Sequence, residues 1–155
     1  MFSHVSVGVV LRYPFGEFYI CFLTGNARGL SMSEYQEQRE VIRWFREKYP
    51  AYIKCTRLSL SGVNLPAGKK AAIMINQFKS QGMVKGEADV LFCVPNANYS
   101  GLFVEMKAEG GRATQDQEDY IVVMRVLGYA ACVIEGAEAA KKMIAAYMET
   151  AHSIH

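Results

Sequence analysis

The stretch ADVLFCVPNANYSGLFVEMKAEGG, which runs from Ala88 to Gly111, contains two apolar segments on either side of a turn. Segments of this kind predict two strands of a buried sheet, joined through residues 95–101. Charged residues interrupt the pattern, because Asp89 opens the first segment and Glu105 and Lys107 lie within the second. A buried strand seldom carries a carboxylate and an ammonium at its centre, so these residues need a separate explanation.

Alternation of side chains along a strand places Glu105 and Lys107 on the same face as Phe103. If the two strands are antiparallel neighbours, the start of the first lies beside the end of the second, and Asp89 joins the pair. Carboxylate oxygens suit Mg²⁺ or Mn²⁺, and a lysine beside such a metal could orient or activate a water. The pattern indicates a site that hydrolyses phosphodiester bonds. The alternative is a structural salt bridge of Lys107 at the solvated end of a strand.

Capping signals and apolar periodicity predict four helices in the rest of the chain. The first begins with a capping box at Ser33 and ends at Pro50, and the second ends near Gly82. The third runs from about Thr114 to Leu127. The apolar faces expected to pack on the core are Ala71, Met74, Ile75 and Phe78 in the second helix, Tyr120, Val123, Met124 and Leu127 in the third, and Ala140, Met143, Ile144 and Tyr147 in the last.

Further strands are predicted at residues 3–12, 17–23, 52–58 and 129–134. The resulting order, β-β-α-β-α-β-β-α-β-α, predicts an α/β fold in which helices flank a central mixed sheet. The first two strands would form an N-terminal β-hairpin. Its exposed edge could pair with a second chain, or the hairpin could pack on the protein's own core.

Composition limits the classes of function. The chain has 155 residues, enough for one domain with a sizeable core, and its net charge of +2 gives no overall basic field. Its four cysteines form no C-x-x-C pair, so we expect buried, reduced thiols in the cytoplasm. Its three histidines lie at the chain ends, so no histidine-based catalytic or metal cluster is expected. The apolar N-terminus lacks a basic leader, so we do not expect it to be a signal peptide, and no segment is long enough and uncharged enough to cross a membrane, so we expect no membrane association. The segment AEGGR, residues 108–112, has no phosphate-loop spacing, so no nucleotide cofactor is expected.

Four segments together resemble the VRR-NUC family, the virus-type replication-repair nuclease branch of the PD-(D/E)XK nuclease superfamily. They are SEYQEQREVIRWFREKYP (33–50), GEAD (86–89), GLFVEMKAEGGRATQDQ (101–117) and LGYAACVIEGAEAAKKMIAAY (127–147). The resemblance implies a single nuclease domain over residues 1–155. Within it, a restriction-endonuclease-like core spans residues 33–147, and residues 1–30 form an added N-terminal hairpin outside the similarity.

The resemblance also implies roles for single residues. Asp89 matches the motif aspartate and Glu105 the second acidic ligand of a Mg (or Mn) ion, whose shell the backbone carbonyl of Met106 would complete. Lys107 matches the catalytic lysine. Ala88 stands where the family usually has proline, and it can take the same extended backbone.

Two further matches have simpler alternatives. Gln117 matches a glutamine that is thought to orient the site, but it is also a suitable capping-box partner of Thr114. Glu34 matches an acidic residue that can reach the same metal cluster, but it also suits the first turn of a helix. Glu87 would point to the side of Asp89 only if the strand already begins there.

Basic residues in loops and at helix starts could contact the phosphates of nucleic acid without reading sequence. They are Lys54, Arg57, Lys69, Lys70, Lys85 and Arg112. Lys69 and Lys70 are the best candidates, although each of these side chains could simply be solvated. Lys141 and Lys142 are expected on the exposed face of the last helix.

The predicted function is that of a Mg-dependent DNA endonuclease in the cytoplasm of a bacterial or phage-infected cell. Small stand-alone members of the family resemble phage proteins, and the family includes homodimers that cut branched DNA such as four-way (Holliday) junctions. An alternative is a non-catalytic DNA-binding or assembly module, and a third is a metal-independent phosphate-binding protein. Joint retention of Asp89, Glu105, Lys107 and Gln117 favours the enzyme.

Overall fold

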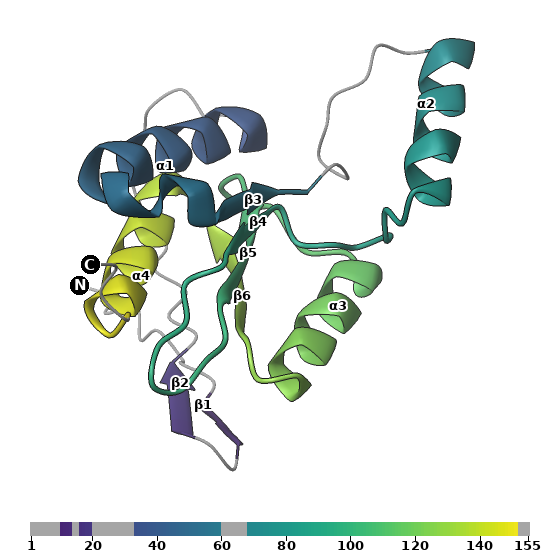
Figure 1. The fold of residues 1–155 in the computed structure, drawn as a ribbon. Helices are drawn as coiled ribbons and strands as arrows, with labels where there is room; N and C mark the ends of the chain where they lie inside the picture. Colours follow the sequence, from purple (N-terminus) through teal and green to yellow (C-terminus); the bar gives the residue numbers. More distant parts are fainter. Residues whose placement is uncertain (1–9, 14–15, 20–32, 60–67, 152–155) are drawn as a thin grey trace, which may run out of the picture.

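The computed structural model describes residues 10–13, 16–19, 33–59 and 68–151 (Figure 1). The elements are β1 (Val10–Tyr13), β2 (Gly16–Tyr19), α1 (Glu34–Lys48), a 3-10 helix (Pro50–Cys55), β3 (Thr56–Leu58), α2 (Lys69–Ser80), β4 (Val90–Phe92), β5 (Leu102–Lys107), α3 (Gln115–Val126), β6 (Ala130–Glu135) and α4 (Ala137–Glu149). From α1 onward, the predicted order of helices and strands is therefore confirmed.

The central sheet has the strand order β3-β4-β5-β6. β3 pairs antiparallel with β4 and β4 antiparallel with β5, whereas β5 and β6 are parallel. This mixed sheet with flanking helices confirms the predicted α/β class. β5 lies in the interior of the sheet and all six of its residues are buried. Within the described part of the chain, no helix has both the length and the apolarity that a membrane span requires.

The two faces of β5 contribute to two separate cores. Leu102, Val104 and Met106 pack in a large cluster with side chains of α1 and α4, such as Phe45 and Ile144. On the other face, a smaller cluster contains Phe103, Ala88, Ile121 and Ala131. Thus α1 and α4 cover one face of the sheet and α3 covers the other, as Figure 1 shows.

Both predicted capping boxes are present. At the start of α1, Ser33 N donates to Gln36 Oε1 over 2.8 Å, and the Ser33 side chain accepts from Gln36 N. At the start of α3, Thr114 and Gln117 repeat the arrangement. Each box satisfies backbone N–H groups that would otherwise lack partners in the first turn, which fixes where the helix begins.

The strand predicted at residues 52–58 is mostly wrong. α1 ends before Pro50 as expected, but Pro50–Cys55 forms a 3-10 helix and only Thr56–Leu58 is strand. The proline has no N–H for a sheet ladder and suits the first turn of a helix. A local bond from Tyr52 N to Tyr49 O then continues that turn.

The expected core face of α2 is also wrong. Figure 1 shows α2 standing away from the sheet and from the other helices, and neither core cluster of the described residues contains one of its side chains. Ala71 is buried, but Met74 and Ile75 are 38% and 37% exposed. The apolar spacing of these residues predicts the helix correctly, but the spacing alone does not show whether the core covers that face of the helix.

The expected core face of α3 is half wrong. Tyr120 and Met124 pack on the smaller core beside the buried Ile121, but Val123 and Leu127 are more than half exposed. α3 contacts the sheet along a narrow strip, because Phe103 alone of the β5 side chains is apolar on this face. Its opposite side therefore carries apolar residues that the small core does not cover.

α4 packs as predicted, with Ala140, Ile144 and Tyr147 buried and Met143 partly buried against the large core. The sequence pattern did not reveal the role of Glu37. This buried carboxylate on α1 accepts a hydrogen bond from Ala137 N and so caps the start of α4, where the N-cap residue is Gly136. The contact joins the two helices that cover the same face of the sheet.

β1 and β2 pair antiparallel in the described backbone. The strands predicted at residues 3–12 and 17–23 extend beyond the described residues, so the role of an N-terminal hairpin stays a prediction. Of the cysteines in the described part, Cys93, which directly follows β4, is exposed, contrary to the expectation of buried thiols.

Candidate metal centre

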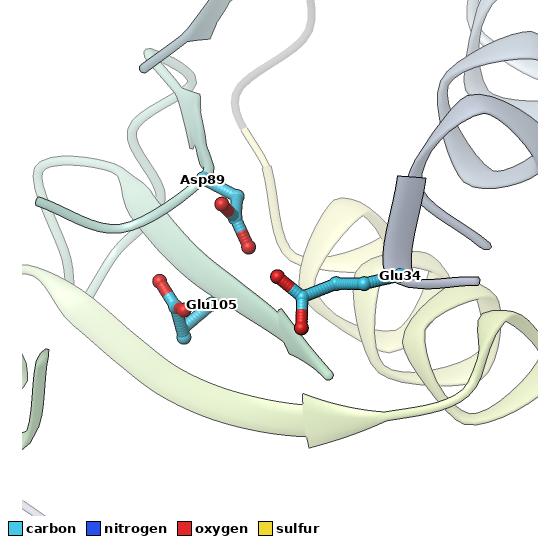
Figure 2. Close-up of side chains that lie close together, drawn as sticks. All are labelled: Glu34, Asp89 and Glu105. Carbon is cyan, nitrogen blue, oxygen red and sulfur yellow. The ribbon is translucent and has the colours of Figure 1, made fainter. Parts of the chain in front are cut away.

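Three carboxylates from separate parts of the chain meet at one end of β5. Each of Glu34, Asp89 and Glu105 offers an oxygen, and these three oxygens lie within 4.8 Å of one another. Glu34 is the first residue of α1, Asp89 directly precedes β4, and Glu105 lies in β5. Figure 2 shows the three side chains directed toward a common space.

The antiparallel pairing of β4 and β5 positions Asp89. Val90 lies opposite Val104, so the residue before Val90 lies beside the end of β5, as predicted. Asp89 Oδ2 accepts a hydrogen bond from Met106 N over 2.8 Å. This bond holds the carboxylate against the strand that carries Glu105 and Lys107, and it leaves Oδ1 for another partner.

Lys107 lies among these carboxylates. Its Nζ is 2.6 Å from Glu105 Oε1 and 3.4 Å from Glu34 Oε2, and the side chain is only 8% exposed. The salt bridge that the sequence left as an alternative does exist. It is buried inside the acidic cluster, however, and Glu105 is fully buried, so it is not an ion pair at a solvated strand end.

Gln117 has both of the roles that its sequence position allowed. Its Oε1 accepts from Thr114 N over 2.8 Å, which completes the capping box of α3. Its Nε2 donates a hydrogen bond to Glu105 Oε1. Gln117 therefore holds Glu105 from the first turn of α3.

Burial and mutual repulsion raise the pKa values of the carboxylates. Burial raises the pKa of Glu105 to about 7, with a smaller upward contribution from Asp89, while the hydrogen bond from Lys107 opposes the shift. Burial also raises the pKa of Asp89, against the lowering effect of the Met106 N–H. For Lys107, burial lowers the pKa, but the bond to Glu105 and the surrounding negative charges raise it more. Lys107 therefore stays charged, and Glu105 exchanges a proton near neutral pH.

One oxygen of the site has no partner among the described residues. Glu105 Oε2 is buried without a hydrogen bond, whereas Oε1 accepts from both Lys107 and Gln117. A buried carboxylate oxygen left alone is costly. The carboxylates of Glu105, Asp89 and Glu34 are grouped and provide the hard oxygen donors that Mg²⁺ or Mn²⁺ prefers, so these residues fit a divalent cation.

Other predicted site residues lie outside this cluster. Glu87 accepts a hydrogen bond from Ser59 Oγ over 3.0 Å and is not one of the three grouped carboxylates. Lys69 and Lys70 open α2, which stands away from the sheet. Lys85 pairs with Asp116 at 2.6 Å. Arg57 donates to the carbonyl of Lys54 over 2.9 Å, and Arg112 is exposed in the segment between β5 and α3.

Comparison with known proteins shows the fold. A solved structure titled "VRR_NUC domain protein" superposes with a TM-score of 0.63 at 22% sequence identity, over 77% of this chain and 91% of that chain. No family model and no curated protein matches the sequence. The chain therefore shares a nuclease-type fold with that domain, as the sequence resemblance implied.

Proposed function

We propose that this protein is a metal-dependent endonuclease that hydrolyses phosphodiester bonds of DNA. The observation that carries the proposal is the grouping of the Glu105, Asp89 and Glu34 carboxylates beside the charged Lys107, in which Glu105 has a buried oxygen, Oε2, without a hydrogen-bond partner among the described residues. In an ion pair formed only for stability, a buried oxygen without a partner is uncommon, because most buried polar atoms in folded proteins are hydrogen-bonded. The nuclease-type fold of the structural neighbour supports the same conclusion.

Asp89, Glu105 and Glu34 would hold the divalent ion, with the carbonyl of Met106 as a further predicted ligand. When bound, such an ion polarises a phosphoryl oxygen and lowers the pKa of a bound water. Glu105 can serve as a ligand through Oε2 while Oε1 keeps its bonds to Lys107 and Gln117. The metal and the lysine would therefore not compete for the same oxygen.

Lys107 would act on the water and on the scissile phosphate. Its ammonium is held by Glu105 and Glu34, and three nearby carboxylates keep it charged. A charged lysine can donate hydrogen bonds to a water nucleophile and stabilise the negative charge that develops on the phosphate. Gln117 would act as a positioning residue, because it reaches the site through Glu105.

DNA is the proposed substrate, and branched DNA such as a four-way junction is the proposed preferred form. Lys69, Lys70, Lys85, Arg112 and Arg57 would contact phosphates. Salt-sensitive binding with little sequence preference is then expected. We further propose that the enzyme acts in the cytoplasm of a bacterial or phage-infected cell, without a nucleotide cofactor, and that two copies present two active sites to two strands.

Cleavage of labelled DNA tests the proposal. A four-way junction, a linear duplex and a single strand would each be incubated with Mg²⁺, Mn²⁺ or EDTA, using the wild type and Lys107→Ala. Lys141→Ala is the matched control, because Lys141 also pairs with two carboxylates but lies on α4, outside the acidic cluster.

Metal-dependent cutting that is lost in Lys107→Ala and kept in Lys141→Ala is the expected result. Equal cutting of all three substrates would retain the nuclease and remove the preference for junctions. Binding without cutting, equal in EDTA and in Lys107→Ala, would overturn the enzyme and leave a DNA-binding module.

A further inference from the structure

The helix α1 carries a line of exposed arginines that the metal centre does not use. Arg39, Arg43 and Arg46 are all exposed, and their spacing of four and three residues places them on one side of the helix. Tyr35, four residues before Arg39, continues the line toward the start of α1 and is 54% exposed. These four residues form what we call the arginine row.

Most carboxylates of α1 are engaged away from the arginine row. Glu34 belongs to the metal centre, and Glu37 and Glu40 are bound to residues of α4. None of the ion pairs between described residues includes an arginine of the row. The remaining carboxylate, Glu47, is exposed one turn after Arg43 and so borders the row. The guanidinium groups are therefore available to an anion outside the chain.

The arginine row begins beside the metal centre. Tyr35 directly follows Glu34, and Figure 2 shows the Glu34 carboxylate directed from the start of α1 toward the other two carboxylates of the centre. The guanidinium carbon of Arg39 lies 5.6 Å from the centre of the Tyr35 ring, which is a cation–π contact. This contact holds Arg39 in place before any ligand arrives, so less side-chain freedom is lost on binding.

The length of the row suits a strand of phosphates better than a single anion. At 1.5 Å per residue, Arg46 lies about 18 Å from Glu34 along the helix axis. Successive phosphates of one DNA strand rise about 3.4 Å along the duplex axis, so this distance corresponds to about five nucleotides. Guanidinium groups also bind phosphate oxygens through two parallel hydrogen bonds, which favours arginine at such contacts.

We propose that the arginine row of α1 holds the phosphates of the DNA strand on one side of the scissile bond, within about five nucleotides of it. The inference rests on the proposed nuclease function, because it requires that the metal centre acts on DNA. The row lies on the same helix as Glu34, so it fixes where the strand lies relative to the metal centre. It therefore positions the substrate as well as attracting it.

Binding of labelled duplex and four-way junction in EDTA, where metal-dependent cutting is stopped, tests the contact without reference to activity. Each phosphate contact contributes about 0.9 to the slope of log affinity against log salt concentration. Arg43→Ala should therefore lower the slope by about 0.9, and the three arginine-to-alanine changes combined by about 2.7. Lys142→Ala is the matched control, because Lys142 is an exposed cation on α4, and its slope should equal that of the wild type.

A change that strengthens binding provides a second arm. Glu47→Gln removes the negative charge that borders the row, so affinity for the duplex should rise by about two- to fivefold. Glu149→Gln removes an exposed carboxylate at the end of α4 and should leave affinity unchanged. Damage to the fold could weaken binding in any variant, but it would not strengthen it, and all the substituted side chains are exposed.

The length of the substrate provides a third arm, in Mg²⁺. Shortening the duplex on one side of the cut below about five base pairs should raise the KM of the wild type, because the row then has fewer phosphates to bind. The combined arginine variant should have a raised KM already and respond little to the shortening. Shortening the other side should affect both proteins equally.

The outcomes separate this inference from the proposed function. Metal-dependent cutting by the wild type, with equal salt slopes in the wild type and the combined arginine variant, would overturn the arginine row and retain the nuclease. The same result is expected if the row binds an acidic protein instead of DNA. Loss of slope in EDTA without cutting in any metal would support the row as a DNA contact and overturn the nuclease.

Discussion

Lys107 Nζ lies 2.6 Å from Glu105 Oε1, while the other oxygen of the same carboxylate is buried without a partner. One oxygen of the Glu105 carboxylate thus binds the ammonium of Lys107, and the other oxygen has no hydrogen-bond partner among the described residues. The same carboxylate is grouped with those of Asp89 and Glu34, whose oxygens lie within 4.8 Å of one of its own. The site can therefore be tested by adding a divalent metal, by changing the pH and by substituting single residues.

Divalent cations should stabilise the folded protein. An ion that binds only the folded state at a hundred times its dissociation constant adds about 2.7 kcal/mol. We expect Mg²⁺ or Mn²⁺ to raise the melting temperature of the wild type. The increase should vanish in Asp89→Asn and shrink in Glu34→Gln, because the Glu34 side chain is 48% exposed. An equal increase in Asp89→Asn would show that the ion binds elsewhere.

In EDTA, stability should fall as the pH rises toward neutrality. The pKa of Glu105 is raised from 4.5 to about 7 by burial, so between these values the folded state binds more protons than the unfolded state. The free energy of unfolding therefore decreases across this window, by up to about 3 kcal/mol. Denaturant unfolding of the wild type and Glu105→Gln measures it. The variant should show a much flatter dependence, and an equal slope in both proteins would contradict the assignment.

Gln117→Ala should damage the site as well as the helix. Loss of the Gln117 half of the capping box leaves the N-cap Thr114 in place and should cost less than about 1 kcal/mol, whereas loss of a residue that orients a metal ligand reduces metal affinity or activity by roughly 10- to 100-fold. Gln36→Ala is the matched control, because Gln36 has the same capping role at α1 and is exposed. It should lose stability without loss of cleavage. Similar cleavage by both variants would show that Gln117 acts only in the capping box of α3 and does not orient the site.

Gly86→Ala should be strongly destabilising. Gly86 has a φ of +80°, and a Cβ at this position would lie 2.3 Å from the carbonyl oxygen of Asp116. We expect a loss of more than about 2 kcal/mol, because backbone strain adds to a clash that no side-chain rotation relieves. Gly82 also has a positive φ, but no atom lies within 4 Å of a Cβ placed there. Gly82→Ala should therefore cost only the backbone strain of about 1–2 kcal/mol. Comparable losses in thermal unfolding would contradict this account.

The sequence predicted what depends on local signals. Ser33 and Thr114 begin helices because their own side chains and the glutamines three residues later form complete capping boxes. Alternation along β5 and the turn before it brought Asp89 to Glu105 and Lys107, because antiparallel pairing across a short turn is almost a local property. The meeting of Asp89, Glu105 and Lys107 was therefore largely predictable, except for the burial that raises the pKa of Glu105.

The features that the sequence did not predict depend on distant surfaces. Met74 and Ile75 have helical periodicity, but nothing in their neighbourhood indicates whether the chain's own core covers them. Val123 is exposed because the core beneath α3 is narrow, which depends on which β5 side chains face that helix. Glu37 reaches the start of α4 across 100 residues of sequence, so no local pattern could reveal it.

The amide of Gln117 has its two ends in different structures, with Oε1 on the start of α3 and Nε2 on Glu105. Glutamate would keep the cap but place a negative charge against Glu105, and lysine could donate but not accept. Asparagine is one methylene shorter and would have to give up one of the two contacts. Few substitutions are therefore tolerated at this position, since a change that preserves the helix cap still disturbs the carboxylate that Gln117 holds.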